Sequence, residues 1–172
     1  MSIIYDQPEI WNVADTATIW MASEIVDVAL EPYTDLRGGG AFSAVFGSVR
    51  FRFNNGLKTW AHANSSGIIF LRGYVILPLV IHELGHRFNI KLKLRPQKQL
   101  WKDKIDPRKG SLWGGFHTRT MADGNEPDEW FANLFADWAM QMLARNAEGD
   151  KLRAWMDEHM PAWVAAAMEV AA

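Results

Sequence analysis

Size, composition and charge limit what this chain can be. Its 172 residues are 49% hydrophobic, which suits a single domain over residues 1–172 with a substantial core. Cysteine is absent, so disulfides and thiolate zinc sites are excluded, and any bound metal must use histidine or carboxylate ligands. The net charge of −2 is unevenly spread: residues 87–109 hold nine Lys or Arg and two acids, whereas residues 123–172 hold ten acids and three bases.

The sequence lacks the patterns of export and of membrane insertion. Residues 1–10 carry Asp6 and Glu9 and no apolar segment, so we expect no signal peptide. The longest apolar run, residues 75–81, is far shorter than the roughly 20 residues that a helix needs to cross a bilayer. We therefore expect a protein without a membrane anchor.

The first half of the chain predicts a helix followed by strands. Residues 11–30 repeat apolar side chains near helical spacing, with Asp15 as the expected cap. Residues 37–40 form a glycine-rich break. Residues 48–53 alternate apolar and basic side chains, as a half-buried strand does, and residues 67–72 predict a second short strand.

The second half predicts helices around a long connector. A helix begins near Leu77, with Pro78 in its first turn, and ends near Asn89. Residues 91–125 predict an irregular connector, and connectors of that length are often functional. A second helix is expected from residue 127 to about residue 147.

The end of the chain predicts one more helical segment. Gly149 is expected to break the preceding helix, and residues 151–170 predict a helix or helix pair with a kink at Pro161. We expect this C-terminal helical extension to cover about residues 149–172. The order of helix, small sheet, helix, connector and helices predicts an α+β domain.

The segment His82-Glu83-Leu84-Gly85-His86 carries the strongest chemical signal. Two histidines four residues apart on a helix present both imidazoles on one face, where they can bind one zinc ion. Glu83 is one position further on and can act as a general base toward a water molecule. Gly85 allows another segment to pack closely. The alternative interpretation is a pair of ordinary core or surface histidines.

A catalytic zinc site needs a third protein ligand, and Glu129 is the leading candidate. Asn133 lies four residues later on the same helix face and could hydrogen-bond the outer nitrogen of a ligand histidine. Glu129 could instead be an acidic residue in a first helical turn that serves only the helix dipole. The other candidate ligands are His117, Asp123, Glu126 and Asp128.

The motif at residues 82–86, followed by Glu129, Ala132 and Asn133, resembles the gluzincin group of metallopeptidases. Within that group the pattern is most similar to ImmA/IrrE-type enzymes and related phage-encoded proteins. The resemblance implies a zincin-like fold in which one helix supplies two histidine ligands and the general base, and a later helix supplies a glutamate ligand. The residues that it implies for these roles and for the support of a ligand are His82, His86, Glu83, Glu129 and Asn133.

Gluzincins also use a residue that stabilises the oxyanion of the tetrahedral intermediate. His117 is our candidate for this catalytic role, with Arg119 and Tyr74 as alternatives. Such peptidases bind the substrate backbone along a sheet edge, which we expect within residues 62–70. The alternative for that segment is a plain hairpin.

The sequence therefore predicts a zinc metalloendopeptidase that acts on a protein or peptide. The alternative is a structural or virion-associated zinc protein with little catalysis. We expect residues 87–109 to be a surface connector rather than a nucleic-acid groove. The expected location is the cytoplasm of a bacterium or phage-infected cell, or a virion.

Overall fold

The computed structural model describes residues 2–36, 40–57, 59, 61–64, 66–73, 75–92, 95–110 and 127–171. These residues form a four-stranded sheet and six α-helices, so the chain is an α+β protein, as the sequence predicts. The strands are β1 (Ser2–Tyr5), β2 (Ser48–Phe53), β3 (Ala61–Ala63) and β4 (Ile68–Leu71). The helices are α1 (Val13–Leu30), α2 (Ala41–Phe46), α3 (Leu77–Lys91), α4 (Pro96–Lys102), α6 (Pro127–Ala139) and α7 (Ala147–Ala171). Single 3-10 turns are η1 (Pro8–Ile10), η2 (Glu31–Tyr33) and η3 (Pro107–Lys109).

The sheet has the order β1-β2-β4-β3, with β1, β2 and β4 parallel and β3 antiparallel to β4. β2 shows the predicted alternation, because Val49 and Phe51 are fully buried while Arg50 is exposed on the opposite face. On that face Arg52 Nη2 lies 2.6 Å from Asp6 Oδ2, which ties β2 to the end of β1. β1 and β3 are the two edge strands of the described sheet.

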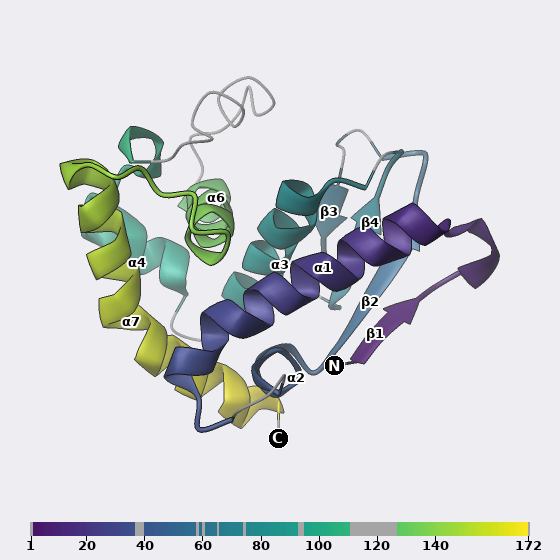
Figure 1. Cartoon of the computed structure of the whole chain (residues 1–172), viewed down its shortest axis with the longest axis horizontal. Coiled ribbons are helices and arrows are strands. Elements are labelled where there is room, and N and C mark those ends of the chain that lie inside the picture. The colour runs from purple at the N-terminus through teal and green to yellow at the C-terminus, as the bar shows by residue number, and fades with distance from the viewer. Residues whose placement is uncertain are drawn as a thin grey trace.

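The helix that carries the motif lies in the middle of the molecule. α1 and α3 lie side by side over one face of the sheet, and α6 packs along α3 (Figure 1). The fully buried side chains that join these layers include Ile19, Val26, Phe51, Ile69, Ile81, Leu84, Phe88 and Phe135.

The start of α1 differs from the prediction by two residues. α1 begins at Val13, and the side chain of Asn12 accepts a hydrogen bond of 2.8 Å from the backbone N–H of Asp15. Asn12 is therefore the N-cap, and the prediction of Asp15 as the cap is wrong. An Asn side chain satisfies a free N–H of the first turn as well as an Asp side chain does, so both residue types gave the same signal.

The sequence patterns miss β1 and α2. α2 begins at Ala41, directly after the glycine-rich break, and the buried carboxylate of Asp27 accepts a hydrogen bond of 2.6 Å from Phe42 N. The group that stabilises the first turn of α2 thus comes from α1 rather than from a neighbouring residue. A cap supplied at this distance in sequence leaves no local pattern to detect.

The expected connector over residues 91–125 contains regular structure. α4 and η3 lie within it, so the prediction of an entirely irregular segment is wrong for residues 96–102 and 107–109. Residues 111–126 lie outside the described part of the chain. α4 is short and buries only Pro96 and Leu100, which is too few apolar positions to reveal a helical repeat.

α6 ends at Ala139 rather than near residue 147. Gln141 adopts a left-handed conformation with φ of 57°, and its N–H bonds to Trp138 O at 3.0 Å. Met142 N bonds to Asp137 O at 2.7 Å, which completes a Schellman C-cap. Glycine normally marks this position, so a cap built on glutamine is hidden from sequence reading.

α7 includes Gly149, which the sequence predicts as a break between helices. Asn146 caps α7 by accepting a hydrogen bond of 2.9 Å from Gly149 N. A Cβ at residue 149 would lie 1.8 Å from Ala144 O, so the glycine permits a close chain approach in the first helical turn. Pro161 lies inside the helix, as predicted.

α7 contributes to the core. Its buried side chains pack with the central cluster and include Met156, Met160, Trp163, Val164 and Ala167. The C-terminal segment predicted as an extension therefore shares the interior with the sheet and α3. In the part of the chain that the structure describes, no helix is long and apolar enough to cross a membrane.

Candidate metal centre

α3 brings two histidines together in the interior. Pro78 occupies the first turn of α3, where its missing N–H costs no intrahelical hydrogen bond. His82 and His86 follow on one face, are 2% and 8% exposed, and have ring centroids 4.6 Å apart with nearly perpendicular planes. Helical spacing of four residues thus produces the convergence that the sequence predicts.

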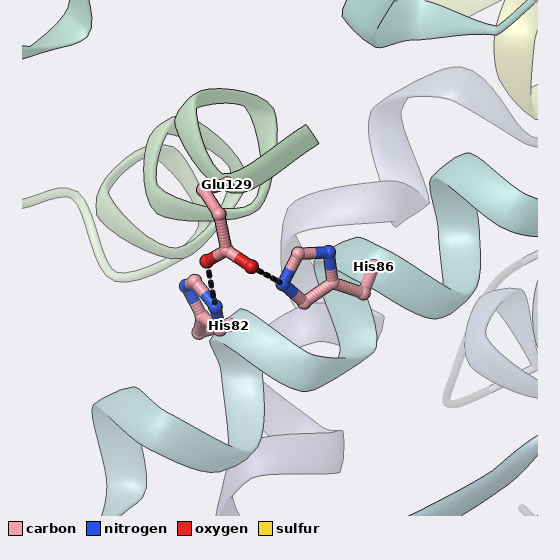
Figure 2. Close-up of side chains that lie close together, drawn as sticks. All are labelled: His82, His86 and Glu129. Atoms are coloured by element: carbon pink, nitrogen blue, oxygen red, sulfur yellow. Dashed lines mark ion pairs between the residues drawn. The ribbon is translucent and has the colours of Figure 1, made fainter. Parts of the chain in front are cut away.

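Glu129 approaches both imidazoles from α6 (Figure 2). Its Oε2 lies 3.3 Å from His82 Nε2, and its Oε1 lies 3.3 Å from His86 Nε2. One potential ligand atom from each of the three side chains lies within 4.8 Å of the others. These residues could together hold one metal ion.

Close packing of α3 and α6 makes this convergence possible. A Cβ at Gly85 would lie 3.0 Å from Ala132 Cα and 3.1 Å from Phe135 Cβ. Such a contact is tight enough that α6 would have to move. Gly85 therefore sets the distance between the helix with the histidines and the helix with Glu129, as the sequence suggests.

The charges of the three side chains are strongly coupled. Burial raises the pKa of the Glu129 carboxyl, but His82 and His86 more than offset this effect and hold that pKa well below its usual range. Burial lowers the pKa of His86, whereas Asp128 and Glu129 outweigh it and raise that pKa to about 10. His86 thus carries a proton at neutral pH when the site holds no metal, and a metal ion would have to replace that proton.

Glu83 has the environment expected of a general base. Its side chain is 4% exposed, and its Oε2 is buried without a hydrogen-bond partner among the described residues. Burial raises the pKa of Glu83, and the nearby His82 and His86 partly counteract that effect. A carboxylate with a raised pKa and a free acceptor oxygen can accept a proton from water near neutral pH.

Sequence reasoning missed the role of Asp128. Its Oδ2 lies 3.3 Å from His86 Nδ1, the nitrogen that points away from Glu129, and its Oδ1 accepts a hydrogen bond from the buried Asn89. Asn89 Oδ1 in turn accepts 3.2 Å from Gln97 N at the start of α4. Asp128 was considered only as an alternative ligand, although its place next to Glu129 on the first turn of α6 was the available signal.

The sequence suggests that Asn133 hydrogen-bonds the outer nitrogen of a ligand histidine, but Asn133 is not the residue that supports His86. Asn133 is half-buried on α6, and its Oδ1 has no hydrogen-bond partner in the described ranges. The outer nitrogen of His86 faces Asp128 instead. Five further residues considered from the sequence lie outside the described part of the chain: Tyr74, His117, Arg119, Asp123 and Glu126.

The edge of the sheet contributes one more ionisable group. His62 is exposed on β3, and its imidazole is close enough to favour the ionised form of Glu83 and so to lower that group's pKa. α3 packs against β3, which places the sheet edge beside the motif helix. The sequence reading included His62 only as part of the segment expected to hold the sheet edge.

Comparisons with known proteins find no match for this chain. No protein-family model matches the chain, no curated protein matches its sequence, and no solved structure matches its fold. The chemistry of the site therefore has to be judged from the geometry of His82, His86, Glu129 and Glu83.

Proposed function

We propose that this protein is a zinc-dependent metalloendopeptidase with a zincin-like arrangement of its site. The observation that carries the proposal is the convergence of His82, His86 and Glu129 from two helices, with Glu83 buried beside them. Two histidines and one carboxylate are the protein ligands of open, catalytic zinc sites, whereas structural sites usually have four protein ligands.

The spacing of the ligand atoms fits zinc. Bonds of about 2.0–2.1 Å in a tetrahedron place two ligand atoms about 3.3–3.4 Å apart. His82 Nε2 lies 3.3 Å from Glu129 Oε2 and His86 Nε2 lies 3.3 Å from Glu129 Oε1, so each nitrogen has its own carboxylate oxygen at that spacing. Glu129 Oε2 is buried and lies 3.3 Å from His82 Nε2, so a cation bound between the two side chains could contact both atoms.

The side chains around the three ligands have separate tasks. When bound, zinc lowers the pKa of a coordinated water toward about 7 and polarises a carbonyl. Glu83 accepts the proton of the attacking water at its buried carboxylate and returns it to the amine that leaves. Asp128 accepts a hydrogen bond from His86 Nδ1, which fixes the imidazole so that Nε2 faces Glu129.

The sheet edge provides a place for the substrate backbone. β3 is the last strand of the described sheet, and α3 packs against it. A peptide that adds to this edge as a strand would lie beside the motif helix, and main-chain hydrogen bonds would hold it without regard to sequence. This arrangement favours a peptide over a small-molecule substrate.

The test compares three forms of the protein. The wild-type protein should bind one zinc and hydrolyse a denatured protein pool. Glu83→Gln should keep its zinc and lose about 10²–10⁴-fold of the rate, because general-base catalysis contributes about that much. Glu129→Ala should lose both zinc and activity. Glu158→Gln, an exposed glutamate on α7, is the control for the change itself.

Three results would contradict parts of this proposal. Zinc retained by Glu129→Ala would remove Glu129 from the ligand set. Full activity in Glu83→Gln would show that hydrolysis does not come from this site. Zinc binding without hydrolysis of any peptide by the wild type would favour the alternative, a structural or virion-associated zinc protein.

A further inference from the structure

α4, η3 and the residues around them form an exposed basic surface. Over residues 95–109 the chain has six bases and two acids. All six bases are exposed, whereas Pro96 and Leu100 of α4 face the interior. The six residues that we call the basic surface are Arg95, Lys98, Lys102, Lys104, Arg108 and Lys109.

The two acids of this segment leave most of that charge unneutralised. Asp106 forms an ion pair of 2.8 Å with Arg108. Asp103 accepts hydrogen bonds from Trp155 Nε1 at 2.8 Å and from Gln99 Nε2, so it is held on the α7 side of the segment. None of the five other bases has a side-chain ion pair within the described part of the chain.

The basic surface begins next to the candidate metal centre. Trp130 follows Glu129 directly on α6, and the Arg108 guanidinium carbon lies 4.8 Å from the centre of its ring. The Trp101 ring on α4 lies 5.9 Å from that of Trp130. α6 thus lies between α3 on one side and α4 on the other (Figure 1).

Two of the bases occupy backbone positions that suit glycine or asparagine better. Arg95 has φ of 47° and Lys104 has φ of 54°, so both adopt the left-handed conformation. Side chains with a long stem reach this region at some cost in backbone energy. These two positions therefore allow the charge to be removed without adding strain.

We propose that the basic surface docks an acidic segment of the protein substrate, across α6 from the helix that carries His82 and His86. That the docked segment belongs to a substrate rests on the proposed function, whereas the docking itself can be measured without turnover. In the described part of the chain the surface offers five bases without an ion pair against one carboxylate, Asp103, which pairs with none of them and is held by Trp155 and Gln99. Complementary charge of this kind raises association rates and selects the partner.

The aromatic content favours a peptide over a single-stranded nucleic acid. Single-stranded nucleic acids bind where successive bases stack on a series of aromatic faces along a basic groove. Here Trp101 is exposed, but Arg108 covers one face of Trp130. Among the described residues of the segment, a single exposed aromatic ring accompanies six basic side chains. This arrangement suits the carboxylates of a peptide better than stacked nucleobases.

The experiment measures binding directly. Fluorescence anisotropy of a fluorescein-labelled peptide of alternating glutamate and glycine is followed on titration with the Glu83→Gln protein, so that no cleavage occurs. The same peptide with glutamine in place of glutamate is the neutral probe, and labelled oligothymidylate tests nucleic-acid binding. The charge variants are Arg95→Asn with Lys104→Asn, and Lys98→Gln with Lys102→Gln. Arg50→Gln with Arg72→Gln is the matched control, because it removes two exposed bases in β2 and directly after β4, away from α4 and η3.

We expect the acidic probe to bind more tightly than the neutral probe and to weaken as salt approaches about 0.15 M, where exposed charges are screened within about 8 Å. Each charge variant should weaken binding of the acidic probe by about threefold to tenfold, because one exposed ion pair contributes little and two act together. Unchanged thermal unfolding in Arg95→Asn with Lys104→Asn would exclude loss of the fold as the cause.

Equal binding of the acidic and neutral probes would overturn the proposal, as would equal loss in the control pair. Tighter binding of oligothymidylate, lost in Trp101→Ala, would overturn it in favour of a nucleic-acid surface. Docking of the acidic probe by a wild-type protein that hydrolyses nothing would contradict the proposed function and leave the docking surface in place.

Discussion

Ionisable side chains are buried on one face of α6 and exposed on the other. On the α3 side His82, Glu83 and His86 are almost fully buried, and each ionisable group shifts the pKa of its neighbours. On the α4 side six bases are exposed to water, and among the described residues only Arg108 has a carboxylate partner. A buried charge interacts strongly with its neighbours and carries a desolvation cost. An exposed charge interacts weakly, so several must act together to bind a partner. Single substitutions should therefore have large effects on one face and small effects on the other.

Outside Glu83 and the three candidate ligands, the largest of these effects is expected for Asp128→Asn. The substitution keeps the side-chain shape but removes the charge opposite His86 Nδ1. Loss of such an outer contact typically lowers metal affinity or activity by about 10- to 100-fold. Zinc affinity measured by competition with a chelator should fall in that range, and exposed Asp35→Asn should leave it unchanged. An unchanged affinity in Asp128→Asn would show that burial alone orients His86.

Gly85→Ala tests the distance between α3 and α6. The added methyl group would meet Ala132 Cα at 3.0 Å, so the two helices must separate. Overpacking of this kind costs about 1–3 kcal/mol, although alanine's better helix propensity returns up to about 1 kcal/mol. Denaturant unfolding should show a net loss of stability together with weaker zinc binding.

Gly40→Ala is the matched control for that prediction. A Cβ at residue 40 would lie 3.6 Å from Leu36, which is an ordinary contact. A Gly85→Ala protein that is as stable as Gly40→Ala, with normal zinc binding, would mean that α6 adapts without moving Glu129.

The smallest effect is expected on the exposed face, for Asp103→Asn. Hydrogen bonds from Trp155 and Gln99 hold the pKa of Asp103 below its usual value of 3.8. A lowered folded pKa adds stability above pH 3.8, and that stability is lost as the pH falls through the folded value. Because Asp103 is exposed, the contribution should be below about 1 kcal/mol.

The free energy of unfolding of wild type and Asp103→Asn should therefore differ slightly near neutral pH and converge in acid. Asp35→Asn provides the reference for a carboxylate without those hydrogen bonds. A difference that grows as the pH falls would have the wrong sign and would refute the role given to Trp155 and Gln99.

The predictability of each element follows from where its determinants lie. α3 and β2 carry their signals locally, in the spacing of His82 and His86 and in the alternation around Phe51, and both elements are found where the sequence places them. α2 depends on Asp27 of another helix, and the end of α6 depends on a glutamine in a left-handed cap. Neither the contact with Asp27 nor the left-handed cap changes the hydrophobic pattern, so the periodicity of the sequence does not reveal them.

The candidate site shows the same division. The sequence predicts that Glu129 joins the two histidines, and the structure brings the three side chains together. It does not predict that Asp128 rather than Asn133 faces His86, because that choice depends on how α6 is rotated against α3. Helix rotation is set by packing around Gly85 and Ala132, which only the tertiary structure reveals.

The sequence distance between the two halves of the metal centre has a consequence for folding. His86 and Glu129 are more than forty residues apart, and they meet only when α6 has docked on α3. A cation held by all three side chains would therefore bind the native state and have little affinity for the unfolded chain. Free zinc at about 100 times its dissociation constant would then add about 2.7 kcal/mol to the native state, so that the metal supply of the surroundings would set how much of the chain is folded.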